Sequence, residues 1–163
     1  MSAEPSVSAA PAKQVVAFIL DAEEYAVPIG QIKEVVKVPS ITLVPNGPEF
    51  VLGVMNLRGQ IVPVLDLEKL FRLEPREQTP AQHVIVTEDA SHTLFGIQVD
   101  RVLEVLTVAE ADIKPAPKMV TSRIAADYLD GVIILQPKPG VERMLLLLNL
   151  TKIVGDKVNE PAK

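Results

Sequence analysis

The feature that most constrains the fold is an internal repeat. Residues 25–38 (YAVPIGQIKEVVKV) align without a gap on residues 95–108 (FGIQVDRVLEVLTV), at an offset of 70 residues. Two shorter pairs recur in the same order, FVLGV at 50–54 with YLDGV at 128–132, and DLEKL at 66–70 with NLTKI at 149–153. Because two copies are present, and a solenoid needs three or more units, the repeat predicts a duplicated domain.

Short apolar runs separated by closely spaced turns predict about five short strands in each copy. Asp66 and Asn149 stand where each would cap a short helix that follows the last strand of its copy. Periodicity alone does not distinguish small barrels from a sandwich. We expect a tail over residues 1–14, one folded domain over 15–156 and a second tail over 157–163. Within that domain, lobe one covers about 15–75, a polar linker 74–82 and lobe two about 83–156, and an exchange of end strands between the lobes is left open.

Composition excludes several classes of function. The chain has 163 residues, 48% of them hydrophobic, which suits one sizeable core or two small cores packed together. It has no cysteine, and its 16 basic against 21 acidic residues argue against nucleic acid as a partner. Apolar runs such as 144–148 are far shorter than a membrane span, and the N-terminal residues lack the pattern of a signal peptide. The sequence therefore predicts a cytoplasmic protein without membrane insertion.

Catalytic and cofactor motifs find little support. His83 and His92 share no metal-ligand spacing, and each is better explained as a strand or turn residue. The acidic run Asp21, Glu23 and Glu24 could bind a hard cation, although a solvated hairpin tip is the simpler interpretation. Glycines form no phosphate-binding pattern, so we expect no cofactor. A small β-barrel enzyme or ligand carrier with an apolar pocket remains a remote alternative.

Residues 53–67 (GVMNLRGQIVPVLDL) join two strand-like apolar runs through a turn that contains Gly59, and so predict a β-hairpin. Arg58 lies at its tip, where a solvated turn residue is the plain alternative. The segment closely resembles the signature G-V-x-N-L-R-G-x-I-x-P-V-x-D-L of the CheW family of chemotaxis coupling proteins. The resemblance extends from Val15 to Val154 and includes residues 96–102 and the motif at Tyr128.

The resemblance implies a mainly β fold of two packed, five-stranded SH3-like barrels, with no enzymatic activity. It implies an adaptor that couples the cytoplasmic tip of a methyl-accepting chemoreceptor to the regulatory domain of the histidine kinase CheA, at membrane-associated receptor arrays. An adaptor of a parallel system for pilus or gliding motility is the alternative within the family.

Residue by residue, the resemblance places receptor binding on Ile32, Glu34, Gly53, Arg58, Val84 and Val105. Receptor tips are helical hairpins, and a helix docks into an apolar groove whose rim charges fix its orientation. The aliphatic residues of this set are equally well explained as core, whereas Glu34 and Arg58 are expected to pair at the groove edge. For kinase binding we select Ile41, Leu43 and Val44, apolar residues on a loop that has little reason to bury them.

Overall fold

The computed structural model describes residues 12–37, 40–45, 47–71, 81, 83–115 and 126–158. These residues form eleven strands: β1 (Ala12–Leu20), β2 (Glu23–Pro28), β3 (Glu34–Lys37), β4 (Val51–Leu57), β5 (Gln60–Asp66), β6 (His83–Glu88), β7 (Leu94–Val99), β8 (Arg101–Ala109), β9 (Ile113–Lys114), β10 (Leu129–Lys138) and β11 (Val141–Leu148). The helices are short: η1 (Ile29–Gln31), α1 (Leu67–Leu70), η2 (Glu110–Asp112), η3 (Ala126–Tyr128), α2 (Leu150–Ile153) and η4 (Val154–Val158). Within the described ranges, no helix has the length and apolar character that crossing a bilayer requires.

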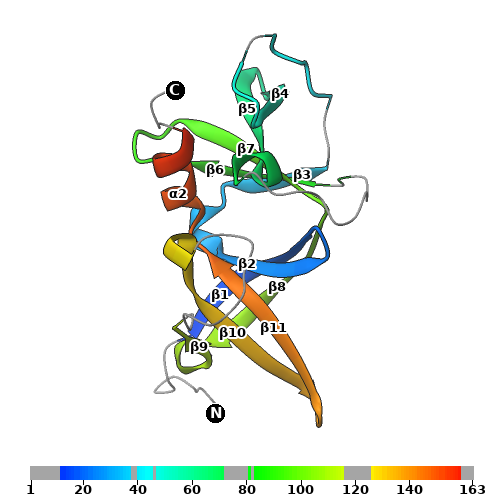
Figure 1. The fold of residues 1–163 in the computed structure, drawn as a ribbon, viewed down its shortest axis with the longest axis vertical. Helices are drawn as coiled ribbons and strands as arrows, with labels where there is room; N and C mark the ends of the chain where they lie inside the picture. Colours follow the sequence, from blue (N-terminus) through cyan, green and yellow to red (C-terminus); the bar gives the residue numbers. More distant parts are fainter. Residues whose placement is uncertain are drawn as a thin grey trace, which may run out of the picture.

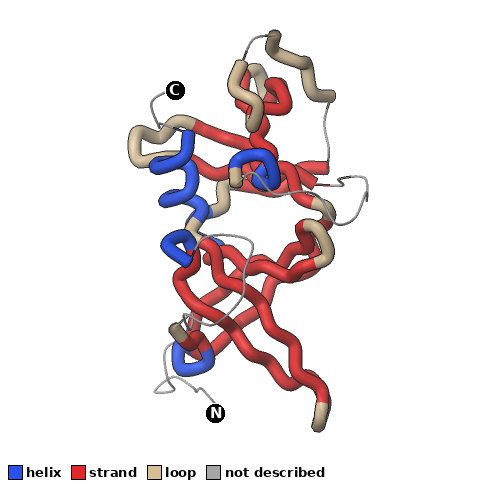
Figure 2. Tube along the Cα trace, viewed as in Figure 1, coloured by secondary structure: helices blue, strands red, loops and turns tan. Residues whose placement is uncertain are grey.

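The strands form two sheets, one in each half of an elongated molecule (Figure 1). One sheet has six strands in the order β8-β1-β2-β11-β10-β9, and the other has five in the order β3-β6-β7-β5-β4. We call the corresponding parts the six-stranded lobe and the five-stranded lobe. Figure 2 shows that strands dominate both lobes and that helices occupy short segments beside them. The predicted mainly β fold with two lobes is confirmed, and the two-residue β9 is the strand that the prediction lacked.

The sheets do not follow the two halves of the sequence. β1 and β2 of the first copy pair with β8 and β11 of the second. Conversely, β6 and β7 of the second copy pair with β3 and β5 of the first. Each lobe is thus completed by the leading hairpin of the other copy, as in a reciprocal exchange between duplicated units. Lobes bounded at about 15–75 and 83–156 therefore do not coincide with the sheets.

The first strand begins before the predicted boundary. β1 starts at Ala12, inside the expected tail, because β8 extends to Ala109 and offers backbone partners to residues 12–14. At the other end, η4 extends to Val158, two residues into the second expected tail. Residues 1–11, most of the expected linker and residues 159–163 lie outside the described residues, so the tails and the linker stay predictions there.

Three apolar clusters form the interior. Each lobe has its own core, and a larger cluster, which we call the shared core, draws residues from both sheets and both α-helices. β1 contributes to two of the clusters, since Val15 and Ala17 face the core of the six-stranded lobe while Phe18 and Leu20 face the shared core. The run VVAFIL is therefore continuously apolar because both of its faces are covered.

Both predicted helix caps are confirmed. The Asp66 side chain accepts hydrogen bonds from the backbone N–H groups of Glu68 and Lys69 at the start of α1. The Asn149 side chain accepts one from Lys152 N at the start of α2, at 3.0 Å. Equivalent caps after the last strand of each copy support the duplication.

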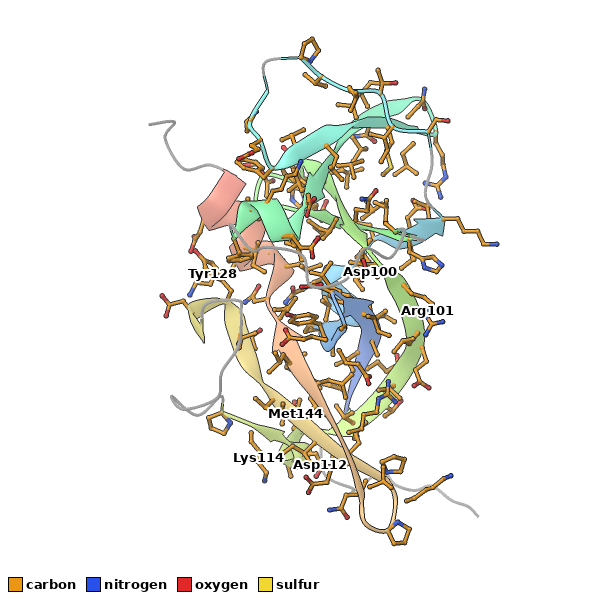
Figure 3. All side chains as sticks on the ribbon, turned by 45° about the vertical axis from the view of Figure 1, so that its right-hand side comes forward. Asp100, Arg101, Asp112, Lys114, Tyr128 and Met144 are labelled. Atoms are coloured by element: carbon orange, nitrogen blue, oxygen red, sulfur yellow. The ribbon has the colours of Figure 1, made fainter. Side chains whose placement is uncertain are left out.

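Gly53 and Gly131 are also equivalent in the repeat, and each allows a neighbouring segment to approach its strand closely. A Cβ atom at Gly53 would collide with the carbonyl oxygen of Thr42 and lie 2.7 Å from Cγ2 of Ile41. A Cβ atom at Gly131 would lie 2.7 Å from the carbonyl oxygen of Lys114, which is labelled in Figure 3 and pairs with Val132 near the start of β10. The absent side chain lets a crossing segment close over the sheet in both lobes.

We predict that Gly53→Ala and Gly131→Ala each lower the free energy of unfolding by about 2 kcal/mol, because overpacking forces backbone away from the strand. Gly30→Ala is the matched control, since no atom lies within 4 Å of its added Cβ. That control should change the free energy by less than about 0.5 kcal/mol. Urea denaturation followed by circular dichroism measures all three, and equal effects at the three sites would contradict the prediction.

Candidate functional site

The β4–β5 hairpin carries Arg58 at its tip. Leu57 pairs with Gln60, so the turn consists of Arg58 and Gly59, whose φ angles are 52° and 84°. Two positive φ angles fit a type I′ turn, whose twist matches that of the flanking strands. Glycine adopts this conformation freely, whereas arginine does so at an energetic cost. The predicted hairpin with Gly59 in its turn is confirmed.

Arg58 forms a two-pronged ion pair with Glu34. Its Nη1 donates to Glu34 Oε2 at 2.6 Å and its Nη2 donates to Glu34 Oε1 at 2.7 Å. These hydrogen bonds lower the pKa of Glu34 below its ordinary value and raise the pKa of Arg58. The Arg58 side chain remains 73% exposed, whereas that of Glu34 is 25% exposed. The pair is therefore preformed at the surface, with most of the guanidinium open to a partner.

This ion pair joins the two ends of the five-stranded sheet. Glu34 lies in β3, one edge strand, while Arg58 directly follows β4, the other edge strand. The segment after β3 also returns to β4, where Thr42 and Val54 exchange backbone hydrogen bonds of 2.8 and 2.9 Å. Backbone groups thus close the barrel at one place and side-chain charges close it at another.

The six-stranded lobe has a comparable glutamate–arginine contact, although its arginine lies on the inner strand β11 and not at the other edge, β9. Glu104, which the repeat aligns with Glu34, lies in the edge strand β8 and accepts a hydrogen bond from Arg143 Nη1 at 2.8 Å. Arg143 belongs to the β10–β11 hairpin, and its Nε also donates to Glu24 at 2.7 Å. Burial by itself lowers the pKa of Arg143. Hydrogen bonds and attraction from its two carboxylate partners together outweigh burial, so the net shift of the pKa is upward. The Arg143 side chain is 22% exposed, so its ion pairs are more buried than the Glu34–Arg58 pair.

The other predicted receptor-binding residues differ in exposure. Ile32, just before β3, is half-buried against the shared core, and Gly53 is buried. Val84 in β6 is fully buried in the core of the five-stranded lobe, so in this structure it supports the site from within. Val105 is 54% exposed, but it lies in β8 of the other lobe. The structure thus brings Glu34 and Arg58 into direct contact, as expected, while the assignment of all six residues to receptor binding stays a prediction.

The residues selected for kinase binding follow β3. Ile41 is half-buried against the core of the five-stranded lobe, whereas Leu43 is 78% exposed and Val44 is 44% exposed. Ile61 in β5 is 62% exposed, and the sequence-based selection missed it. The sequence alone does not show that Ile61 is exposed, because it directly precedes the buried Val62 in a continuously apolar run.

The acidic turn after β1 is occupied by contacts within the fold. Asp21 is buried, which corrects the expectation of a solvated tip, and its backbone N–H donates to Asp100 Oδ2 at 2.8 Å. Asp100 lies where the chain passes from β7 in one sheet to β8 in the other (Figure 3). The Tyr25 hydroxyl donates to Glu23 at 2.6 Å. Across the described ranges, no set of three or more His, Cys, Asp or Glu side chains is arranged to hold a metal ion.

Both histidines make structural contacts. His83 Nδ1 accepts a hydrogen bond from the backbone N–H of Val102 at 3.1 Å, which ties β6 of one sheet to β8 of the other. His92 is exposed in the β6–β7 turn, with its Nδ1 3.3 Å from Glu88 Oε1. Lys33 also contacts Glu88 at 3.0 Å, and hydrogen bonds from Lys33 and His92 lower the pKa of Glu88.

Gln31 is a further residue that the sequence did not reveal. It lies in η1, where the chain crosses from β2 in one lobe to β3 in the other. Its Oε1 accepts hydrogen bonds from the backbone of Leu150 at 2.8 Å and Thr151 at 3.4 Å, and its carbonyl oxygen accepts one from Thr87 Oγ1 at 2.7 Å. Gln31 thus anchors the segment that leads to Glu34. Neighbouring residues in the sequence do not indicate these contacts of Gln31, because its partners are 56 or more residues away.

Comparison with known proteins gives one consistent result. The family model described as CheW-like domain matches residues 14–158. The chain is 32% identical to chemotaxis protein CheW of Treponema pallidum, covering 88% of this chain and 83% of that protein. It is 33% identical to chemotaxis protein CheW of Klebsiella aerogenes, covering 86% and 80%. The crystal structure of scaffolding protein TtCheW from Thermoanaerobacter tengcongensis has a TM-score of 0.74 at 32% identity, with 93% of each chain covered.

We predict that Glu34 titrates below 4.5, its ordinary value, because Arg58 stabilises the ionised carboxylate. The contribution of this pair to stability is therefore present above the unfolded-state pKa and is lost as the pH falls through the lower, folded-state pKa. Arg58→Ala should move the Glu34 midpoint up toward 4.5. Carboxyl ¹³C NMR titration measures both midpoints, and a midpoint that Arg58→Ala leaves unchanged would show that the pair does not persist in solution.

Proposed function

The chain belongs to the CheW family, and from this we propose that it is a non-enzymatic scaffold of bacterial chemosensory signalling. In this role it couples the cytoplasmic tips of chemoreceptors to a CheA-type histidine kinase. It works in the cytoplasm and is recruited to membrane-associated receptor arrays. The observation that carries the proposal is the family match over residues 14–158, which spans both lobes together with the hairpin that bears Arg58.

The Glu34–Arg58 pair supports a role in receptor binding. A helical receptor tip presents an apolar face with flanking polar groups, and a docking surface needs both apolar contact and charges that fix orientation. Two N–H groups of Arg58 are engaged by Glu34, and a guanidinium has five, so donors remain for a partner. Because the pair holds the side chain in place before binding, little rotamer entropy is lost when a partner docks.

Exposed apolar side chains of the five-stranded lobe support a role in kinase binding. Leu43, Val44 and Ile61 are exposed apolar residues on the five-stranded lobe, where exposure costs solvation free energy that a protein contact would recover. Both lobes are built mainly of strands, and a kinase domain of similar fold would pair with this protein lobe against lobe. We assign kinase contacts to Ile41, Leu43 and Val44, as selected from the sequence, and add Ile61, which lies in the β4–β5 hairpin that carries Arg58.

The direct test is reconstitution. Purified protein alone should show no ATPase, phosphotransfer or hydrolase activity, because its proposed role is to bring two partners together. Added to receptor-containing membranes and CheA, it should raise the rate of kinase autophosphorylation. A receptor and kinase mixture that is fully active without this protein would refute the coupling function.

The charge pair allows a sharper test. Arg58→Ala and Glu34→Ala should each weaken capture by a receptor-tip fragment by about tenfold or more, since a charged interface contact is lost. Capture by the CheA regulatory domain should be unchanged, and the melting temperature should shift little because exposed ion pairs contribute little to stability. The exchange Glu34→Arg with Arg58→Glu should not restore capture if the guanidinium itself meets the receptor.

Lys33→Ala is the matched control for these variants. Lys33 is exposed, adjacent to Glu34 and paired with Glu88 at 3.0 Å, so its removal deletes an ion pair from the same region. Receptor capture should change less than about twofold in this variant. A receptor-binding role for Arg58 fails if Arg58→Ala binds the receptor tip as well as Lys33→Ala does.

A further inference from the structure

Arg58 occupies a backbone position that disfavours its own side chain. Its φ angle of 52° lies in the left-handed region, and the first position of this type of turn favours asparagine, aspartate or glycine. A strained conformation persists only where surrounding contacts determine it, and it often marks a functional constraint. The ion pair with Glu34 is one such contact. A second contact acts on the backbone of the turn.

Asn56 supplies that contact. Its Oδ1 accepts a hydrogen bond of 2.7 Å from the backbone N–H of Gly59, on the far side of the turn. The bond spans Leu57 and Arg58, so it restricts the backbone angles of Arg58, the first turn residue, and of Leu57 before it. Asn56 is itself exposed, and it sits opposite Ile61 in the β4–β5 ladder. An exposed asparagine whose side chain bonds to the turn backbone has a role in shaping the turn.

The shape of the turn determines where the guanidinium can reach. Arg58 has a long side chain with many rotamers, and it forms both hydrogen bonds to Glu34 from one backbone orientation. If the turn relaxed toward negative φ at Arg58, the Cα–Cβ bond would point in another direction, and the paired geometry would be lost. Pre-organising the turn therefore raises the fraction of molecules in which the pair is formed.

We propose that Asn56 is a positioning residue for the Glu34–Arg58 pair, which it orients by holding the left-handed turn through the Gly59 N–H. The proposal rests on the proposed function in one respect, namely that a receptor meets this pair. The positioning itself is a property of the free protein. Asn56 therefore governs receptor affinity without touching the receptor.

The test uses NMR of the full chain without any partner. Asn56→Ala should speed hydrogen exchange of the Gly59 amide and move the Glu34 titration midpoint upward, in the direction that Arg58→Ala moves it but by less. Asn56→Asp retains a side-chain acceptor, and it should keep the Gly59 amide protected and the Arg58 guanidinium protons slow to exchange. In a separate measurement, Asn56→Ala should weaken capture by a receptor-tip fragment by about fivefold, the loss of one hydrogen bond.

Asp89→Ala is the matched control. Asp89 Oδ1 accepts hydrogen bonds from Ser91 N at 2.8 Å and Thr93 N at 2.9 Å in the β6–β7 turn. That turn also contains a residue with positive φ, His92 at 66°. The control thus removes a turn-stabilising side chain of the same kind from the same lobe. It should leave the Glu34 midpoint and the Gly59 amide unchanged.

An unchanged Glu34 midpoint in Asn56→Ala, alongside a clear shift in Arg58→Ala, would overturn the positioning role. An equal shift in Asp89→Ala would also overturn it, since the effect would then reflect general loosening of the lobe. Failure of the proposed function gives a different result: the Glu34 and Gly59 signals respond as expected, while neither Arg58→Ala nor Asn56→Ala changes receptor capture.

Discussion

Burial of apolar side chains between the two sheets is the interaction on which the rest of the structure depends. The shared core contains the largest fully buried aromatic side chains, Phe18 and Tyr25, stacked with ring centroids 5.7 Å apart. Fully burying one such side chain contributes about 1.5–3 kcal/mol, far more than an exposed ion pair contributes. Apolar burial, most of all in the shared core, therefore contributes more to stability than the surface ion pair does. The exposed Glu34–Arg58 pair contributes little to this stability, and we expect the fold to survive its loss.

The shared core also explains why each lobe contains strands from both copies. A strand that is buried on both faces, such as β1, cannot complete one barrel alone without leaving its other face exposed. In the exchanged arrangement β1 and β2 contribute to both the core of the six-stranded lobe and the shared core, and β6 contributes to both the core of the five-stranded lobe and the shared core. The chain crosses between the lobes at η1 and at Asp100, and these crossings are fixed by Gln31 and by the Asp21 amide. The segment that carries Glu34 is thus anchored on one side by the other lobe.

Local signals in the sequence predict the features that neighbouring residues encode, and they do not predict those that depend on distant contacts. The hairpin, the caps at Asp66 and Asn149 and most strand positions follow from spacing and turn chemistry within a few residues. The assignment of strands to sheets does not, because an apolar run buried on both faces has the same pattern whichever partner it has. Val84 illustrates the limit at the site: an aliphatic residue in a strand is equally compatible with a groove and a core, and the structure buries it completely.

Both lobes have a glutamate in an edge strand that pairs with an arginine from a later hairpin, yet the two ion pairs differ. Arg143 is largely buried and shared between Glu104 and Glu24 on different strands, so all its neighbours lie within the fold. Arg58 is bound by Glu34 alone among the described carboxylates and is largely exposed on a strained turn. Loss of a buried, shared charge leaves carboxylates without a partner and costs stability, whereas loss of an exposed pair costs little. In the six-stranded lobe the pair is thus largely enclosed by the fold, whereas in the five-stranded lobe most of the Arg58 side chain stays exposed to solvent.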